Sequence, residues 1–377
     1  MGTDGIGRLC FGLFINFKKL LPYYMALKTI FLDKIGSVTK NASLSHDVWV
    51  TDAVVAAEGA MLAVEVLEDK KIYNQLELVT GRMSTMKKGD LLAVALGNRR
   101  ALKGFVGNVP EKLAVGDVIQ VLNLGGVAGL CLSENFKEVG HALNVRVLGA
   151  IVGSGQPKDG SEERPLNIKD FKLFSGKDHL EGSMKLIIVS GTCMNVGKTS
   201  VASEIIKQLA QKGKKIFGAK LTGVAAMRDV ENMRDYGARE AVSFVDAGYA
   251  STVANGEESV RVSKGALDFL SAGAPDYIVV EFGDGVYGEY GVMSILKDIE
   301  IQAKVVAHIG CAHDPMGAVK LVEICKEIGA PVHVISGPVT DNSVGTEFIE
   351  RTLSLPAYNG LSQGEALIDY LLLSCLK

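Results

Sequence analysis

A glycine-rich loop flanked by two apolar patterns constrains this chain more than any other feature of its sequence. Residues 186–189 form an apolar run typical of a buried strand, and residues 198–211 carry apolar side chains at the spacing of an amphipathic helix. The loop between them, residues 191–199, has the sequence GTCMNVGKT. A strand, a glycine-bounded turn and a helix in this order can point backbone N–H groups into one concavity, and the helix N-terminus adds partial positive charge. The pattern therefore predicts a phosphate-binding loop.

Individual residues of this loop have distinct predicted roles. The Lys198 side chain would reach the outer phosphates of a bound nucleotide, and the Thr199 hydroxyl would ligate Mg²⁺. The residues predicted to bind the nucleotide here are Gly191, Thr192, Asn195, Val196, Gly197, Lys198, Thr199 and Ser200. The alternative is a turn with a purely structural role.

The loop departs from the commonest phosphate-loop pattern, because five residues rather than four separate Gly191 from Gly197. The longer form, with Asn195-Val196 before Gly-Lys-Thr, resembles the loop of dethiobiotin synthetase and its cobyric-acid-synthase relatives. This resemblance implies ATP and Mg²⁺ as cofactors and a P-loop fold for the C-terminal part of the chain.

Length and composition favour a two-domain α/β enzyme. The 377 residues suffice for two hydrophobic cores, and 47% hydrophobic residues with 43 glycines exclude a disordered chain. The formal net charge is −3 without a basic block, so the electrostatic footprint of a nucleic-acid-binding protein is missing. Six cysteines without paired spacing are typical of reduced thiols in the cytoplasm. We expect a small-molecule substrate and a homo-oligomeric assembly.

Residues 9–31 are strongly apolar, but two lysines and a proline interrupt them, so no run approaches the ~20 residues of a membrane span. We predict no membrane span and assign residues 1–26 to an apolar N-terminal extension. It could be a docking helix or packed extension, an addition upstream of a native start at Met25, or a targeting signal.

Residues 27–152 alternate apolar and polar positions between glycine-containing turns, which predicts a small β-barrel or sandwich. The clearest predicted strands are 91–97, 101–107 and 117–124, and residues 55–67 are predicted to form a flanking helix. No spacing typical of catalysis occurs in this part. Residues 153–183 are rich in Gly, Pro and charge, which predicts an interdomain linker that is exposed at least in part.

Strand and helix patterns alternate regularly through residues 184–377. After the loop, the predicted strands are 215–223, 242–248, 277–281, 304–310 and 331–337, and the predicted helices are 230–241, 260–273, 292–302 and 318–329, with two more around Glu347 and Leu367. Continuous apolar strands between helices indicate a doubly wound, mostly parallel sheet of P-loop NTPase type. Ligands of such sheets bind outside the carboxyl ends of the strands.

Charged residues end two of these strands at the predicted ligand edge. Glu281 follows an apolar strand, and a carboxylate beside a phosphate loop is a suitable contact for Mg²⁺. The matching strand of dethiobiotin synthetase ends in a metal-contacting Glu, so the resemblance implies Glu281 as a metal residue, with Asp284 as a second candidate. Lys220, followed by Leu221 in place of a proline, resembles the lysine between substrate and γ-phosphate in that family. The alternatives are a helix-capping carboxylate and a solvated lysine.

A longer series of motifs resembles a second P-loop family. The series is GTC-x-x-VGK at 191–198, FVDAG at 244–248, VE-x-G at 280–283 and CAHD at 311–314. It is similar to the family that includes the D-amino-acid N-acyltransferases, which implies a loop that holds the phosphates of an acyl-CoA. A base such as His313 would then deprotonate the accepting amine.

His308, Cys311, His313 and Asp314 form an H-x-x-C-x-H-D series after one predicted strand. Three interpretations stay open: zinc ligation, acid–base action by His313 held by Asp314, and capping of the next helix by Asp314.

Asp341 and Asn342 follow the last long predicted strand. In the P-loop superfamily that this chain resembles, such a loop cradles the nucleobase, so either side chain could bind an exocyclic amine. Asp341 is equally well placed as a helix N-cap.

These patterns together favour a Mg²⁺-nucleotide-dependent enzyme that activates a carboxylate or carbamate of a small amino or carboxylic acid by γ-phosphoryl transfer. The candidate catalytic residues are Lys198, Lys220 and His313, and the candidate metal residues are Thr199, Glu281 and Asp284. An N-acyltransferase that uses acyl-CoA on an amino acid is the second hypothesis. A nucleotide-switched, non-enzymatic partner protein is the third.

Overall fold

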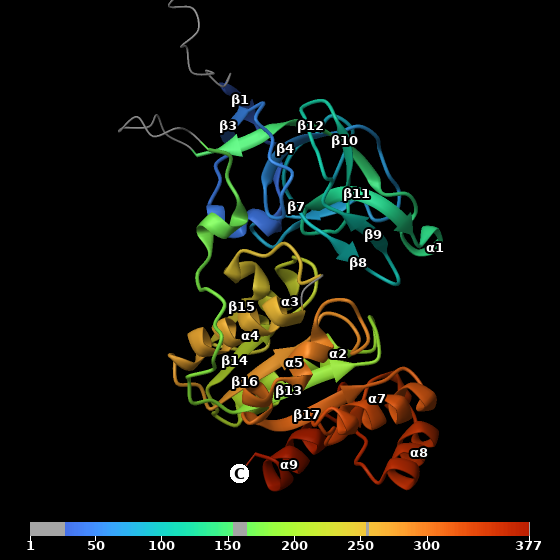
Figure 1. Cartoon of the computed structure of the whole chain (residues 1–377). Helices are drawn as coiled ribbons and strands as arrows, with labels where there is room; N and C mark the ends of the chain where they lie inside the picture. Colours follow the sequence, from blue (N-terminus) through green and yellow to red (C-terminus); the bar gives the residue numbers. More distant parts are fainter. Residues whose placement is uncertain (1–26, 154–163, 254–255, 377) are drawn as a thin grey trace, which may run out of the picture.

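Two main sheets, one in each domain, organise the chain, as its strand patterns predict (Figure 1). A separate two-stranded sheet pairs Gln75–Glu77 with Met83–Thr85. The computed structural model describes residues 27–153, 164–253 and 256–376. The extension predicted for residues 1–26 lies outside the described residues, so its alternatives stay predictions. Figure 1 shows the β-rich domain at one end of the molecule and the α/β domain, which carries the C-terminus, at the other.

The β-rich domain is built around a closed ring of five strands. Its elements are β1 (Leu27–Phe31), β2 (Lys34–Ile35), η2 (Ser37–Ala42), β3 (Asp47–Thr51), β4 (Met61–Val66), β5 (Gln75–Glu77), β6 (Met83–Thr85), β7 (Leu91–Leu96), β8 (Arg99–Arg100), β9 (Phe105–Asn108), β10 (Val118–Val121), β11 (Val127–Glu134), α1 (Phe136–Val139) and β12 (Leu143–Val152). β4 pairs with β7 and β12, β11 pairs with β7 and β10, and β10 pairs with β12. The β-rich domain is therefore confirmed, and the closed ring is the barrel of the two predicted alternatives.

The helix predicted at residues 55–67 is wrong, because Met61–Val66 form β4 of the barrel. Leu62 and Val64 fill the barrel interior, whereas Ala63 between them joins a core that continues into the α/β domain. Both faces of the strand are covered, so the polar positions that would reveal a period of two are missing.

The α/β domain is a six-stranded parallel sheet with helices on both faces. Its elements, preceded by η3 (Ile168–Phe171), are β13 (Leu186–Gly191), α2 (Lys198–Gln211), β14 (Ile216–Lys220), α3 (Arg228–Asp235), β15 (Glu240–Ser243), η4 (Phe244–Ala247), α4 (Gly256–Ser271), β16 (Tyr277–Glu281), α5 (Val292–Lys297), α6 (Ile299–Gln302), β17 (Val305–Cys311), α7 (Pro315–Glu327), β18 (Val334–Ser336), η5 (Pro338–Thr340), α8 (Ser343–Leu353) and α9 (Gly364–Ser374). The strand order is β15-β14-β16-β13-β17-β18, and all neighbouring strands are parallel.

Helices cover this sheet on both sides because alternate side chains of its strands enter two different cores. Leu186 and Ile188 of β13 join the core formed with α4, α5 and α7, whereas Ile187 and Val189 join the core formed with α2, α3 and α9. The predicted doubly wound architecture is therefore confirmed.

Several elements end earlier than the sequence pattern predicts; the helix predicted at 230–241, for example, ends at Asp235, and Glu240 and Ala241 belong to β15. The strand predicted at 242–248 stops at Ser243, because Ser243 and Asp246 cap each other's backbone and start a 3-10 helix. The helix predicted at 292–302 is divided at Asp298, which has extended backbone and caps α6 with its side chain. In the latter two places a short polar side chain competes with regular structure by bonding a nearby backbone N–H group.

The described part of the predicted linker, residues 164–183, is anchored to both domains as it runs between them in Figure 1. Met61 N donates to Leu166 O at 3.0 Å in the barrel, and Leu173 N donates to Asp246 O at 2.7 Å in the α/β domain. The domain borders themselves stay predictions.

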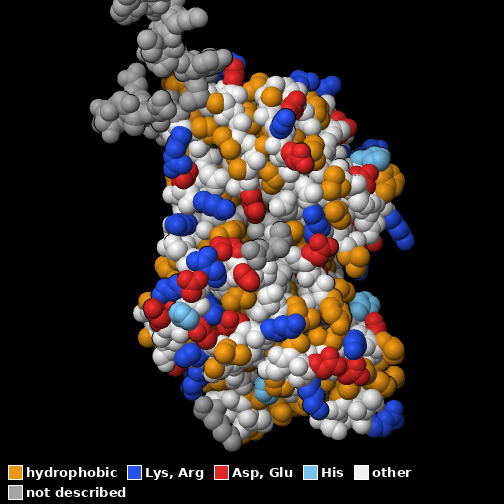
Figure 2. Space-filling view, viewed as in Figure 1, with side chains coloured by type: hydrophobic (Ala, Val, Ile, Leu, Met, Phe, Trp, Pro, Cys, Tyr) orange, Lys and Arg blue, Asp and Glu red, His pale blue; other side chains and the backbone are white. Residues whose placement is uncertain are grey.

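The molecular face in Figure 2 carries basic and acidic side chains in alternation, with apolar side chains between them. This mixture agrees with the small net charge of −3. Among the described residues, no helix combines the length and apolar character needed to cross a membrane.

Candidate functional site

The glycine-rich loop follows β13 at the carboxyl edge of the sheet and leads directly into α2. Asn195 and Gly197 have positive φ angles of 62° and 84°, which turn the loop back on itself. A Cβ atom on Gly191 would lie 2.7 Å from the Val196 side chain, so the loop closes only over glycine at this position. The strand, loop and helix thus adopt the arrangement that the sequence predicts.

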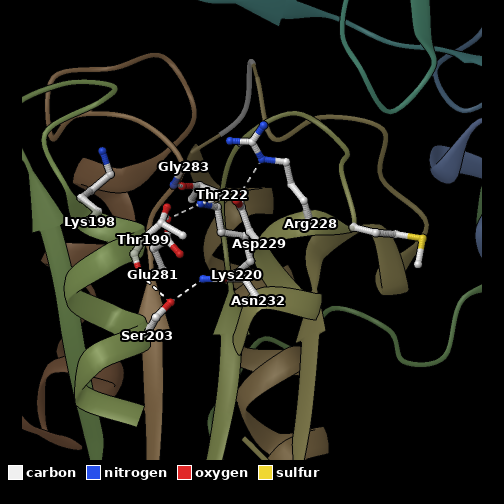
Figure 3. A network of polar contacts seen from close by, with 12 residues as sticks. Lys198, Thr199, Ser203, Lys220, Thr222, Arg228, Asp229, Asn232, Glu281 and Gly283 are labelled. Atoms are coloured by element: carbon white, nitrogen blue, oxygen red, sulfur yellow. Dashed lines mark hydrogen bonds and ion pairs between the residues drawn. The ribbon is translucent and has the colours of Figure 1, made fainter. Parts of the chain in front are cut away.

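Thr199 and Lys220 both bond the Glu281 carboxylate beyond this loop (Figure 3). Thr199 Oγ1, in the first turn of α2, donates to Glu281 Oε1 at 2.6 Å. Lys220 Nζ lies 2.6 Å from the same oxygen and 2.8 Å from Asp229 Oδ2. Glu281 and Lys220 are register partners at the ends of the neighbouring strands β16 and β14. Parallel pairing therefore brings together two charges that are 61 residues apart.

The two lysines of the site are in different charge environments. Burial lowers the pKa of Lys198, and the positive charge of Lys220 lowers it further. Lys198 Nζ donates to Cys193 O at 2.7 Å, and no ion-pair carboxylate lies within 4 Å of it among the described residues. Burial acts on Lys220 in the same direction, but Asp229 and Glu281 outweigh it and raise its pKa. Lys220 is thus a fixed, compensated cation, whereas Lys198 can pair with a bound anion.

The oxygen atoms beside the loop suit a hard divalent cation. Glu281 Oε2 is buried and has no hydrogen-bond partner in the described part of the chain. A hydroxyl and one carboxylate, completed by phosphate oxygens and water, form the donor set that Mg²⁺ prefers. Thr199 and Glu281 therefore fit the predicted metal role. The described residues contain no cluster of three His, Cys, Asp or Glu, so this cation would depend on phosphate for its coordination.

Asp284, the second metal candidate, is near enough to Lys198 for their charges to interact, but it has no hydrogen bond or ion pair with Thr199 or Glu281 among the described residues. It lines a different cavity of about 720 Å³ together with Thr192 and Cys193. Burial raises the pKa of the Asp284 carboxyl. The structure therefore does not bring Asp284 into the group formed by Thr199, Lys220 and Glu281.

A cavity of about 560 Å³ lies between the two domains and includes the glycine-rich loop in its wall. The α/β wall contains Asn195, Gly197, Lys198, Thr199, Ser200, Lys220, Asp229 and Glu281, and the β-rich wall contains Tyr73, Arg99, Lys103, Asn123 and Leu124. Asn123 Nδ2 donates to Ala225 O at 2.5 Å and joins the two walls. A cavity of this volume at a domain boundary is a usual place for a small ligand.

The contributions of the β-rich domain and of α3 to the site are not evident from the sequence. Glu77 accepts from the N–H groups of Met227 at 2.6 Å and Arg228 at 2.7 Å, where α3 begins. The same helix supplies Asp229, the second partner of the strand-end lysine. Arg99 lines the cavity from the opposite wall. No local sequence motif identifies these residues. The one sequence feature that could indicate them is a charged side chain beside an apolar, strand-like run.

The residues after β17 do not enter this cavity. His313 is exposed and is not part of the cavity wall. Asp314 Oδ1 accepts from Gly317 N at 2.9 Å and caps α7, as one of the three interpretations predicts. His308 is buried, its Nε2 lies 2.7 Å from Ser190 Oγ, and burial lowers its pKa to about 4. This neutral histidine bonds its own sheet, and no zinc cluster forms among the described residues.

The loop predicted to contact a nucleobase lies beside the glycine-rich loop. A Cβ atom on Gly337 would lie 2.6 Å from Val196 O. Asn342, rather than Asp341, is the N-cap of α8 and accepts a backbone N–H at 3.0 Å, so the capping role considered for Asp341 is wrong. Asp341 Oδ1 instead accepts from Asn359 Nδ2 at 2.9 Å. Both side chains are exposed, and their nucleobase role stays a prediction.

Comparisons with known proteins identify no family for the chain. No family model matches it, and no curated protein does. Among solved structures, it is similar to the cell division protein FtsY from Thermotoga maritima, with 17% identity, a TM-score of 0.37, and coverage of 52% of this chain and 69% of that one. The signal recognition particle 54 kDa protein from Aeropyrum pernix, in complex with GDP, has 16% identity and a TM-score of 0.35, covering 48% and 43%.

A third similar structure is FtsY from Elizabethkingia anophelis in complex with GDP, with 15% identity, a TM-score of 0.33, and coverage of 53% of this chain and 68% of that one. Similarities this distant carry no argument about activity. The fold of the α/β domain is nevertheless of P-loop NTPase type, on the evidence of its own sheet, loop and helix. Neither the dethiobiotin-synthetase nor the acyltransferase resemblance gains support from these comparisons.

Proposed function

We propose that this chain is a Mg²⁺-ATP-dependent enzyme that activates a carboxylate or carbamate of a small acid by γ-phosphoryl transfer. The observation that carries the proposal is the Glu281 carboxylate beside the glycine-rich loop, which Thr199 and Lys220 both bond. Asp229 is the second partner of Lys220. A hydroxyl, an unpartnered carboxylate oxygen and a cation grouped beside this loop are what transfer of the terminal phosphate of a loop-bound nucleotide would need.

Each residue has a role that follows from its environment. Lys198 and the backbone N–H groups of the loop hold the outer phosphates. Lys220 cannot act as a base, because Asp229 and Glu281 keep it protonated. Two carboxylates compensate it in the nucleotide-free protein, and it would offset negative charge on the transferred group once the Glu281 carboxylate binds Mg²⁺. Thr199 and Glu281 would hold Mg²⁺, which supplies charge neutralisation for the phosphates when bound.

The two-domain cavity supports a reaction with a second substrate. Phosphoryl transfer to an acid requires room for an acceptor in line with the terminal phosphate, and exclusion of water from the transferred group. The β-rich domain supplies part of the cavity wall, so an acceptor bound there would contact both domains. The terminal phosphate would pass to a carboxylate or carbamate oxygen, and ADP would leave.

The acyltransferase hypothesis has less support from the described residues. Its proposed base, His313, is exposed and does not line the cavity. The metal-suited oxygens at Glu281 would also be unnecessary for an acyl-CoA whose phosphates do not react.

An activity assay separates these hypotheses. The protein is incubated with a panel of small amino and carboxylic acids and either Mg-ATP or acetyl-CoA, and release of ADP and phosphate is compared with release of CoA. We expect acid-dependent ADP release that Lys220→Met abolishes and His313→Ala leaves unchanged. Acid-dependent CoA release without nucleotide cleavage would overturn the proposal, and tight nucleotide binding with no turnover would favour a nucleotide-switched partner protein.

A further inference from the structure

Arg99 is a buried cation in the β-rich wall of the interdomain cavity. The residue is only 5% exposed, and among the described residues no carboxylate forms an ion pair with it. Its Nη1 donates to Tyr73 OH at 2.8 Å and to the Leu122 carbonyl, but its Nε is buried without a partner. A buried guanidinium with an unused donor and no counter-charge is unfavourable unless a ligand supplies the missing anion.

The residues around Arg99 hold its guanidinium group in one orientation. The guanidinium carbon lies 5.4 Å from the ring centre of Tyr73 and 5.7 Å from that of Phe105, so two aromatic rings hold the planar group. Tyr73 has a positive φ of 53°, which is unfavourable for a tyrosine. A Cβ atom on Gly104 would lie 2.9 Å from Nη2, so glycine leaves room for the guanidinium. Lys103 adds a second cation to the same wall.

The phosphates of a nucleotide already have their own cations on the other wall. Lys198 and Lys220 both belong to the α/β domain and lie at the glycine-rich loop. Arg99 faces the same cavity from the opposite domain, so it can reach a part of the second substrate that does not react. Nη1 already has two partners and Nε is buried, so Nη2 is the donor that a carboxylate in the cavity can reach.

We propose that Arg99, assisted by Lys103, binds a carboxylate of the second substrate, which is therefore a small dicarboxylic acid. One carboxylate, or a carbamate in its place, reacts at Lys220 and Glu281, and the other is held by Arg99. The inference rests on the proposed function for the fate of the reacting group. The binding of a dicarboxylate by Arg99 can be measured independently of turnover.

Calorimetry on the full chain tests this binding. Malonate, succinate, glutarate and adipate are titrated into protein with and without Mg-ADP, and acetate and inorganic phosphate serve as comparison anions. We expect at least one dicarboxylate to bind about tenfold or more tightly than acetate. Arg99→Met should weaken that binding about tenfold or more, and Arg99→Lys should also weaken it because the planar group held by Tyr73 and Phe105 is lost.

Further variants keep the test informative if replacement of Arg99 prevents folding. Lys103 is exposed, so Lys103→Met should fold and should weaken dicarboxylate binding to a smaller extent. Arg82→Met, an exposed arginine of the same domain outside the cavity wall, is the matched control and should change nothing. Affinity for Mg-ADP should be equal in all folded variants.

Three results would overturn the inference: no dicarboxylate binds more tightly than acetate, phosphate binds more tightly than every dicarboxylate, or Arg99→Lys reduces Mg-ADP affinity. The last result would assign Arg99 to the nucleotide phosphates instead. Dicarboxylate binding that depends on Arg99 without any acid-dependent ADP release would support this inference while overturning the proposed function.

Discussion

Lys198 is a buried charge without an ion-pair carboxylate among the described residues, so it is available to a bound anion. Burial lowers its pKa, so the folded protein without nucleotide binds this proton less tightly than the unfolded chain does. The charged lysine is therefore destabilising below its folded pKa, and this cost fades as the pH rises toward the ordinary value of 10.5.

Lys198→Ala should weaken nucleotide binding about a hundredfold, or roughly 3 kcal/mol, because the outer phosphates lose their mobile cation. The same change should leave the free energy of unfolding of the nucleotide-free protein equal or higher at pH 7. This difference from wild type should shrink at pH 10. Calorimetry with ADP and ATP, and urea unfolding at both pH values, measure the two effects. Unchanged affinity for every nucleotide tested would remove the phosphate-loop assignment.

Glu281 is the residue at which the proposed metal role and the fold can be separated. Glu281→Gln keeps the shape of the side chain, and Asp229 remains to pair with the buried Lys220. We expect turnover to fall about a hundredfold or more, because the anionic oxygen that favours Mg²⁺ is lost. Nucleotide binding in the presence of EDTA should be nearly unchanged. Normal turnover would show that the metal is held elsewhere, and Asp284→Asn would then be tested.

At the scale of elements, α3 connects the β-rich domain to Lys220 in the candidate site. Glu77 of β5 caps its first N–H groups, and Asp229 in its first turn pairs with Lys220. A carboxylate at a helix N-terminus is favourable both as a hydrogen-bond acceptor and as a negative charge near the helix dipole. The cap lies in one domain and the helix in the other, so the β-rich domain bonds the start of the helix that carries Asp229, a partner of Lys220.

Glu77→Gln should lower the free energy of unfolding by about 1–2 kcal/mol, the usual cost of weakening a helix cap. It should also speed amide hydrogen exchange in residues 228–235 and reduce kcat more than nucleotide affinity. Glu111→Gln, an exposed glutamate of the same domain, is the matched control. Equal exchange rates in α3 for the two variants would contradict a positioning role for Glu77.

Elements with a local sequence pattern could be predicted from the sequence, whereas elements whose burial depends on contacts with both domains could not. The apolar run 277–281 and the glycine-rich loop lie in the predicted places because a covered parallel strand and a phosphate loop have local signatures. The strand β4 was predicted as a helix because the barrel covers one face and the second domain the other. The pairing of Glu77 with α3 spans 150 residues, and no periodicity encodes it.

At the scale of the molecule, the turn before β11 and the loop before α3 set how closely the two walls of the cavity approach. Asn123 Nδ2 bonds Ala225 O at 2.5 Å. A Cβ atom on Gly125 would lie 2.1 Å from the same oxygen, so this glycine permits the backbones of the two domains to touch. The φ of Gly125 is not in the range that disfavours other residues, which makes alanine here a purely steric probe.

Gly125→Ala should push the two walls apart, because a backbone carbonyl cannot yield to the added methyl group. Overpacking of this kind typically costs about 1–3 kcal/mol, which should appear as a lower melting temperature or as two separate unfolding transitions. Nucleotide affinity should persist, since the glycine-rich loop and its cations all belong to the α/β domain. Acid-dependent turnover should fall much further, because an acceptor would lose the wall that carries Arg99.

Gly153→Ala, at a position where the Cβ atom meets open space, is the control and should match wild type. If Gly125→Ala lowers nucleotide affinity and turnover equally, the β-rich domain contributes to the nucleotide site rather than to a separate acceptor site.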